Sequence, residues 1–292
     1  MNFASMLPLP ATTADWPLLA TAFGLGACIG SFLNVCIYRL PEDESVVWPS
    51  SRCPACETAI AWYDNIPIVS WLVLRARCRT CGATIAPRYP LVEAATGALA
   101  VLALAVFGPT LQALVAFAFT AALLLITFVD LDHLFIPDEV SLPGILVGLG
   151  VSLLPGGIGL VDATFGALVG GGILWAVAWG YERSTGVEGM GFGDVKLLAM
   201  IGAFLGWQAI PAILVIASIA GAGAGVAVVL AHGGRRAGRR VVRRFGMRAL
   251  LPHLRHVARH TAIPFGPFLA LGATVVLYLP DLGLPLRLFG LH

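Results

Sequence analysis

The chain has 292 residues, of which 58% are hydrophobic and only 12% charged, and its formal net charge is +2. This composition excludes an ordinary water-soluble globular protein and indicates a protein that crosses a membrane several times. Several apolar stretches approach the roughly 20 residues that a helix needs to cross a bilayer. A membrane-spanning strand barrel would show short alternating segments instead, so the sequence predicts an all-α polytopic membrane fold.

Apolar length predicts about eight transmembrane helices along the chain. The segment 1–16 carries no basic residue before the first apolar run, so this run is expected to be a retained span and not a cleaved signal peptide. The sixth predicted span is short. The predicted spans lie near 17–38, 91–107, 110–130, 139–155, 160–180, 194–207, 209–231 and 263–280.

Basic residues are concentrated in two loops. Six of the 18 Arg and Lys residues fall in 39–90, and nine, all Arg, fall in 232–260. The positive-inside rule places both loops in the cytoplasm, and eight spans meet this condition when both termini lie outside. The same membrane topology places 131–138 and 181–193 on the cytoplasmic side. The Arg-rich run lacks aromatic interleaving of the kind used for base stacking, so we interpret it as a lipid-headgroup anchor and expect no nucleic-acid partner.

Four cysteines form two CxxC pairs in the first of these loops. "CPAC" supplies Cys53 and Cys56, and "CRTC" supplies Cys78 and Cys81, with 21 residues between the pairs. Two such turns provide the four thiolates that a structural Zn²⁺ prefers, and thiols stay reduced in the cytoplasm. A redox pair and an iron–sulfur cluster are the alternatives. The remaining cysteines lie within the first span and are expected to be buried small apolar residues.

Acidic residues beside membrane spans are candidates for function because an uncompensated carboxylate in a low-dielectric setting is costly. Asp130 directly follows the apolar run of the third span, and Asp194 follows three glycines at the start of the sixth. Two carboxylates that meet at one depth share a proton. One can then activate a water while the other protonates a carbonyl oxygen, as in aspartic proteases.

Other interpretations of these polar residues remain open. From the Gly-x-Gly-Asp tetrapeptide alone, a helix cap is the favoured interpretation of Asp194. Asp138 is more typical of a cap or topology marker, and Asp132 is compatible with a water-facing position. His133 is either a proton partner of the pair or a residue at headgroup level. Lys196 can pair with Asp194, but we favour extension of its side chain to the membrane interface.

Several motifs in register resemble the bacterial type IV prepilin peptidases, which are membrane aspartyl proteases of the Gly-x-Gly-Asp kind. The resemblance spans nearly the whole chain and implies that Asp130 and Asp194 form the catalytic pair. The matching motifs are "GSFLNVCIYRLP" (30–41), the two CxxC pairs, "RYPLVE" (88–93), "DLDHLFIPD" (130–138), "GMGFGDVKLL" (189–198) and "IPFGPFLALG" (263–272).

The resemblance implies a bifunctional enzyme of the bacterial inner membrane. Such an enzyme removes a short basic leader from pilin-like proteins of type IV pili or type II secretion, cutting after Gly at the cytoplasmic face. Members with the cysteine loop usually also methylate the new amino terminus with S-adenosylmethionine. The matched motifs offer Asn34, Arg39, Arg88 and Glu93 as candidates for methyl transfer.

The sequence also predicts how the chain is divided into functional regions. Residues 1–38 form the first membrane segment, 39–90 the zinc loop associated with methyl transfer, and 91–292 the protease domain with its basic loop 232–260. The acidic run 42–44 could attract a basic leader, but we favour an ordinary solvated charge run.

Two other functions compete with this interpretation. In a transporter, Asp130 and Asp194 would bind protons or cations, and Gly-interrupted helices suit such a role. Against it, both carboxylates are predicted at the membrane edge, and the sequence shows no inverted repeat. In the second alternative the chain is a peptidase without methyltransferase activity, and the cysteine loop is a docking module.

Overall fold

The computed structural model describes residues 16–186, 191–232 and 264–279. In this part of the chain the secondary structure is helical apart from two isolated β-bridges, which confirms the predicted all-α class. The helices are α1 (Trp16–Arg39), α2 (Val69–Val73), α3 (Arg88–Phe107), α4 (Leu111–His133), α5 (Asp138–Val151), α6 (Leu160–Thr185), α7 (Phe192–Leu205), α8 (Ile210–His232) and α11 (Gly266–Tyr278), with short 3-10 helices η2 (Leu40–Glu42), η3 (Trp62–Asn65) and η4 (Trp207–Ala209).

Each predicted span coincides with one helix, but the helices differ in length. Within the described residues, five are long and apolar enough to cross a membrane: α1, α3, α4, α6 and α8. In contrast, α5 and α7 have 14 residues each and α11 has 13, fewer than the roughly 20 that a full crossing needs. The eight predicted spans are thus matched in order by eight helices, five of which reach the length of a full crossing in the described residues. The three short helices are packed together, since α7 contacts both α5 and α11.

Small residues bring two pairs of helices into close contact. Gly26 and Gly30 of α1 face α3. A Cβ added to Gly26 would lie 2.9 Å from the Cα of Gly97, and one added to Gly30 would lie 2.7 Å from the Cα of Glu93. Gly166 of α6 and Gly202 of α7 likewise oppose each other, backbone against backbone. In lipid, where apolar side chains gain little from leaving the solvent, such close backbone packing is a main source of helix association.

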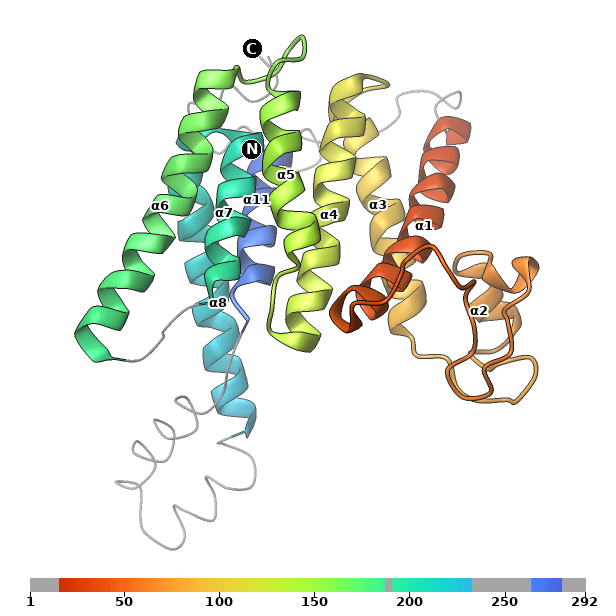
Figure 1. The fold of residues 1–292 in the computed structure, drawn as a ribbon. Coiled ribbons are helices and arrows are strands. Elements are labelled where there is room, and N and C mark those ends of the chain that lie inside the picture. Colours follow the sequence, from red (N-terminus) through yellow and green to blue (C-terminus); the bar gives the residue numbers. More distant parts are fainter. Residues whose placement is uncertain (1–15, 187–190, 233–263, 280–292) are drawn as a thin grey trace, which may run out of the picture.

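Helix α4 joins the two sides of the molecule. A large buried cluster combines α4 with α7, α8 and α11, whereas a smaller one combines α4 with α1 and α3. Figure 1 shows α4 between the pair α1 and α3 and the group that contains α5, α7 and α11. A residue near the end of α4 therefore lies where both halves meet.

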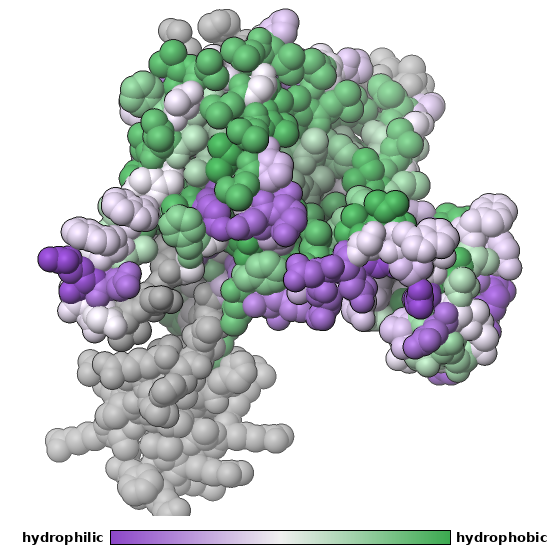
Figure 2. Space-filling model, in the orientation of Figure 1, coloured by the Kyte–Doolittle hydropathy of each residue, from purple (hydrophilic) through white to green (hydrophobic). Residues whose placement is uncertain are grey.

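The polar connections gather at one end of the bundle. Figure 1 shows the C-terminal ends of α1, α4 and α6, the N-terminal ends of α3, α7 and α11, and the loop 43–87 at this end. Figure 2 shows an apolar surface over the helices and hydrophilic residues below it. The loops 39–90, 131–138 and 181–186 thus lie at the same end, as the membrane topology derived from the sequence predicted. Nearly all of the basic loop 232–260 lies outside the described residues.

Candidate functional site

Asp130 occupies a buried position in the last turn of α4. Its side chain is only 5% exposed, and its Oδ2 accepts a hydrogen bond of 3.0 Å from the backbone N–H of Gly266. Gly266 is the first residue of α11 and has no side chain to obstruct this approach. A Cβ at this position would lie 2.5 Å from Asp130 Oδ2. The start of α11 therefore closes tightly over one candidate catalytic carboxylate.

Asp194 lies in the first turn of α7, close enough to Asp130 for the two charges to interact. Gly191 holds the N-cap position of α7, so Asp194 is the third residue of the helix and not its cap. A Cβ on Gly193 would lie 3.0 Å from Ile136, and the same Ile136 contacts the Gly266 position. Ile136 therefore packs between Gly266, which contacts the Asp130 carboxylate, and Gly193, which precedes Asp194. The structure brings the predicted pair together, while its catalytic role remains a prediction.

The neighbouring acidic residues form ion pairs. Asp132 pairs with Arg88 at the start of α3, and Asp138 pairs with Lys196 of α7. The alternative pairing of Lys196 with Asp194 is wrong, while the favoured extension of Lys196 to the interface stays a prediction. The reason lies in tertiary packing, because α5 and α7 run side by side and bring Asp138 next to Lys196. His133 is exposed at the end of α4, with its ring 6.4 Å from that of Phe135.

The four cysteines of the two CxxC pairs converge on one point. Their sulfur atoms all lie within 4.8 Å of one another, and the Sγ atoms of Cys53 and Cys81 are 3.8 Å apart. Four sulfurs bound tetrahedrally to Zn²⁺ at about 2.3 Å would be separated by about 3.8 Å. None of the cysteines is in a disulfide. The donor set and its spacing therefore fit a closed, four-sulfur zinc site.

The two turns that carry these cysteines have the same construction. The backbone N–H of Cys53 donates to the carbonyl of Thr58 at 3.0 Å, and that of Cys78 donates to Ala83 at 2.8 Å. The residue after each pair takes a left-handed conformation, with φ of 72° at Gly82 and 55° at Glu57. Glycine adopts this conformation without strain, whereas Glu57 adopts it with a side chain present. The turn of "CPACE" therefore has the same geometry as that of "CRTCG", although it lacks the glycine.

Hydrogen bonds prepare one of these thiols for metal binding. Donation from the backbone N–H groups of Cys81 and Thr80 lowers the pKa of Cys78 to about 6. The Ala83 hydrogen bond lowers the pKa of Cys81, but neighbouring sulfurs and burial outweigh it and raise this pKa to about 11. The lowered pKa favours the thiolate form of Cys78, and metal binding would draw protons from the thiols that remain.

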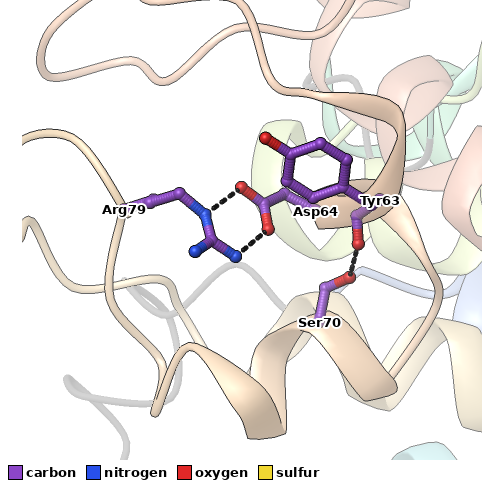
Figure 3. Close-up of polar contacts among 4 residues, drawn as sticks. All are labelled: Tyr63, Asp64, Ser70 and Arg79. Atoms are coloured by element: carbon purple, nitrogen blue, oxygen red, sulfur yellow. Dashed lines mark hydrogen bonds and ion pairs between the residues drawn. The ribbon is translucent and has the colours of Figure 1, made fainter.

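A bidentate ion pair braces the cysteine loop. Arg79, inside the second CxxC turn, donates from Nε and Nη2 to the two carboxylate oxygens of Asp64 at 2.7 and 2.6 Å, as Figure 3 shows. The Arg79 guanidinium also lowers the pKa of Asp64, so this carboxylate remains ionised. In the same view, Ser70 of α2 donates to the carbonyl of Tyr63. These contacts connect the second turn to η3 and η3 to α2.

Two of the four candidates for methyl transfer, Arg39 and Glu93, anchor the loop to the membrane helices, and a third, Asn34, joins α1 to α3. Asn34 of α1 donates to the carbonyl of Tyr89 at 3.1 Å. Arg39 donates to the carbonyls of Ser45 and Pro49, and Glu93 accepts a hydrogen bond of 2.7 Å from the Ile68 backbone. Asn34, Arg39 and Glu93 also line a cavity of about 1110 Å³ beneath the loop. Arg88 is instead paired with Asp132.

Comparison with known proteins identifies the family. The model of the "Bacterial Peptidase A24 N-terminal domain" matches residues 25–107, and that of the "Type IV leader peptidase family" matches 117–226. A protein of Aeromonas hydrophila named "Prepilin leader peptidase/N-methyltransferase" is 38% identical over 91% of this chain and 92% of its own length. The chain belongs to the type IV leader peptidase family.

Further relatives carry the same name. A protein of Burkholderia pseudomallei (strain 1026b) is 39% identical over 89% of this chain and 85% of its own length. One from Myxococcus xanthus is 45% identical over 77% of this chain and 67% of its own length. The search of solved structures gave no match.

The family match separates the two sites. The cysteines fall within the matched N-terminal domain, and Asp130 and Asp194 fall within the leader peptidase match. Gly266, which donates to Asp130, lies beyond both matched ranges. Sequence reasoning included "IPFGPFLALG" among the matching motifs but missed the role of this glycine, as it missed the position of Ile136. The lone glycine before Pro267 was the available signal.

Proposed function

We propose that this chain removes the leader peptide from prepilin-like proteins and then methylates the new amino terminus. The observation that carries the proposal is that Asp130 and Asp194, on different helices, lie within range of electrostatic interaction at the polar end of a membrane bundle. Membership of the type IV leader peptidase family and relatives named for both activities support it. The transporter alternative is not favoured, because both carboxylates lie at the end of the bundle.

The aspartate pair suits hydrolysis of a peptide bond. One carboxylate takes a proton from a water, whose oxygen attacks the scissile carbonyl carbon. The other, protonated, donates its proton to the carbonyl oxygen, and the tetrahedral intermediate then collapses with protonation of the leaving amine. Burial of Asp130 and its hydrogen bond from Gly266 fix one carboxylate of the pair in position.

The position of the pair suits a substrate that is partly in the membrane. We assign the polar end to the cytoplasmic face of the bacterial inner membrane, because the Arg-bearing loop 39–90 lies there. A pilin-like substrate of a type IV pilus or type II secretion system would keep its apolar helix among lipid and the exposed apolar side chains of the bundle. Its basic leader would then reach the carboxylates from the cytoplasm.

The cysteine loop supplies the second activity in this proposal. Cys53, Cys56, Cys78 and Cys81 would hold a structural Zn²⁺ that organises the loop, since four protein ligands leave no open position for catalysis. S-adenosylmethionine would supply the methyl group. Arg39 and Glu93 would position the loop over its cavity through the hydrogen bonds described above, and Asn34 would hold α1 to α3 at the cavity wall.

Mass spectrometry of a processed substrate tests both activities. Purified full-length protein in lipid nanodiscs would be incubated with a prepilin-like substrate and S-adenosylmethionine. We expect a product that starts directly after the leader glycine and is heavier than the unmodified fragment by the replacement of one hydrogen with one methyl group. An uncut substrate would contradict the peptidase proposal. A cut but unmethylated product would support the peptidase proposal and contradict the methyltransferase proposal.

A further inference from the structure

The cavity beneath the cysteine loop is large enough for a cofactor. Its volume is about 1110 Å³, slightly above the usual range of small-molecule sites. Its walls come from the loop and from the adjoining ends of α1 and α3. The hydrogen bonds from Asn34 and Arg39 and the one accepted by Glu93 cross between these parts. The cavity is thus formed by a braced framework before any ligand arrives.

Aromatic side chains on the cavity wall have large exposed areas. Tyr38 is 62% exposed and Trp48 is 76% exposed, and Tyr63 and Tyr89 also line the cavity with exposed rings. Exposed aromatic rings gathered on a concave wall are typical of a ligand surface. Their faces can stack on a flat heterocycle and attract a cation.

The charged groups on the same wall favour a ligand with a net positive charge. The lining has four carboxylates and three guanidinium groups: Glu44, Glu57, Asp64 and Glu93, and Arg39, Arg52 and Arg79. Arg79 is occupied by Asp64, and Arg39 by backbone carbonyls. In the described part of the chain neither Glu44 nor Arg52 belongs to an ion pair. These two remain available to the ammonium and carboxylate groups of an amino acid.

We propose that this cavity binds an adenosyl sulfonium methyl donor, with Trp48 and Tyr38 holding its adenine ring and sulfonium cation. The inference rests on the proposed function, because it locates the donor for the methyl-transfer activity. Adenine is the heterocycle that stacks, the sulfonium is the cation that an aromatic face attracts, and the amino acid end matches Arg52 and Glu44. S-adenosylmethionine carries all three features.

One buried cluster connects the α3 wall of the cavity with the end of α4 that carries Asp130. Val92, next to Glu93, and Val129, next to Asp130, belong to one buried cluster of α1, α3 and α4. The ion pair of Arg88 with Asp132 joins the same two helices at their polar ends. An amino terminus released at the aspartates would therefore reach the donor by moving past the polar ends of α4 and α3.

Calorimetric titration of the full-length protein in nanodiscs tests the site without requiring turnover. S-adenosylmethionine would be titrated into wild type, Trp48→Ala, Trp48→Phe and Tyr38→Ala. Trp62→Ala is the matched control, because Trp62 belongs to the same loop and is 80% exposed but does not line the cavity. Zinc content would show that each variant keeps a folded loop.

We expect wild type and Trp62→Ala to bind alike, Trp48→Ala and Tyr38→Ala to bind about tenfold more weakly, and Trp48→Phe to retain most of the affinity. Equal affinity in Trp48→Ala, Tyr38→Ala and wild type would overturn the proposed site and leave the proposed function standing. Absence of binding to wild type would also overturn it, and mass analysis of product made by the same preparation would show whether methylation itself fails.

Discussion

At the scale of single residues, the candidate active site depends on a glycine far from either aspartate in sequence. Position 266 must be free of a side chain, because a Cβ there would approach Asp130 Oδ2 to 2.5 Å. The same backbone donates the hydrogen bond that Asp130 accepts. Gly266 therefore both contacts the carboxylate and leaves space for it.

Replacing Gly266 by Ala is expected to slow cleavage about tenfold to a hundredfold, because the added methyl group displaces the Asp130 carboxylate from Asp194. Initial rates of cleavage of a prepilin-like substrate would measure this effect. Gly172→Ala on α6 is the matched control, since nothing lies within 4 Å of a Cβ there. Equal rates in Gly266→Ala and wild type would show that the closeness of α11 to Asp130 is irrelevant to catalysis.

Hydropathy alone could identify Asp130 and Asp194 as candidates, because each adjoins an apolar run at a predicted membrane boundary. It could not choose the partner of Lys196, which depends on how α5 and α7 are packed. It also could not pair Asp130 with Gly266, since the hydrogen bond joins positions 136 residues apart. Local patterns thus find charged residues, while tertiary packing decides which groups they meet.

At the scale of elements, the cysteine loop is a small domain that has little apolar core of its own. Its only described α-helix is α2, of five residues, and Val69, Leu72 and Val73 of this helix are exposed. The two CxxC turns are instead held by their backbone hydrogen bonds and by the Arg79–Asp64 pair. So small an element needs a metal or a similar staple to be stable. The CxxC spacing predicted this element well, because the ligand chemistry is local to each turn.

Replacing Cys53 by Ser is expected to remove zinc from the purified protein and to abolish methylation, because three sulfur ligands no longer close the site. Elemental analysis and mass spectrometry of the product would measure the two effects. Cys28→Ser is the matched control, since Cys28 lies in α1 outside the cysteine cluster. Wild-type protein purified without any metal would refute the zinc site, and iron in its place would favour the cluster alternative.

At the scale of the whole molecule, the order of the helices could be predicted from sequence, but their depth in the membrane could not. Each apolar run became one helix, yet α5, α7 and α11 stop well short of a full crossing. Helix α7 is surrounded by other helices and has most of its residues buried, so protein contacts replace lipid around it. Apolar composition is the same in both settings, which is why hydropathy does not distinguish a helix surrounded by protein from one surrounded by lipid.

This arrangement separates the two proposed activities while keeping them adjacent. The zinc loop is fixed to α1 and α3, and the aspartates belong to α4 and α7, with α4 packed against both groups. Loss of an aspartate should therefore leave the cysteine loop folded. The expectation gives an internal control for any variant of the catalytic pair, because zinc content reports on the other half of the molecule.

The most direct measurement is cleavage of a prepilin-like substrate by wild type, Asp130→Asn and Asp194→Asn in nanodiscs, followed by mass spectrometry. Asparagine keeps the size of the side chain but cannot exchange the proton that the mechanism requires. We expect each variant to lose cleavage by at least about a thousandfold while retaining zinc and helical content. Cleavage near the wild-type rate by either variant would show that Asp130 and Asp194 are not the catalytic pair.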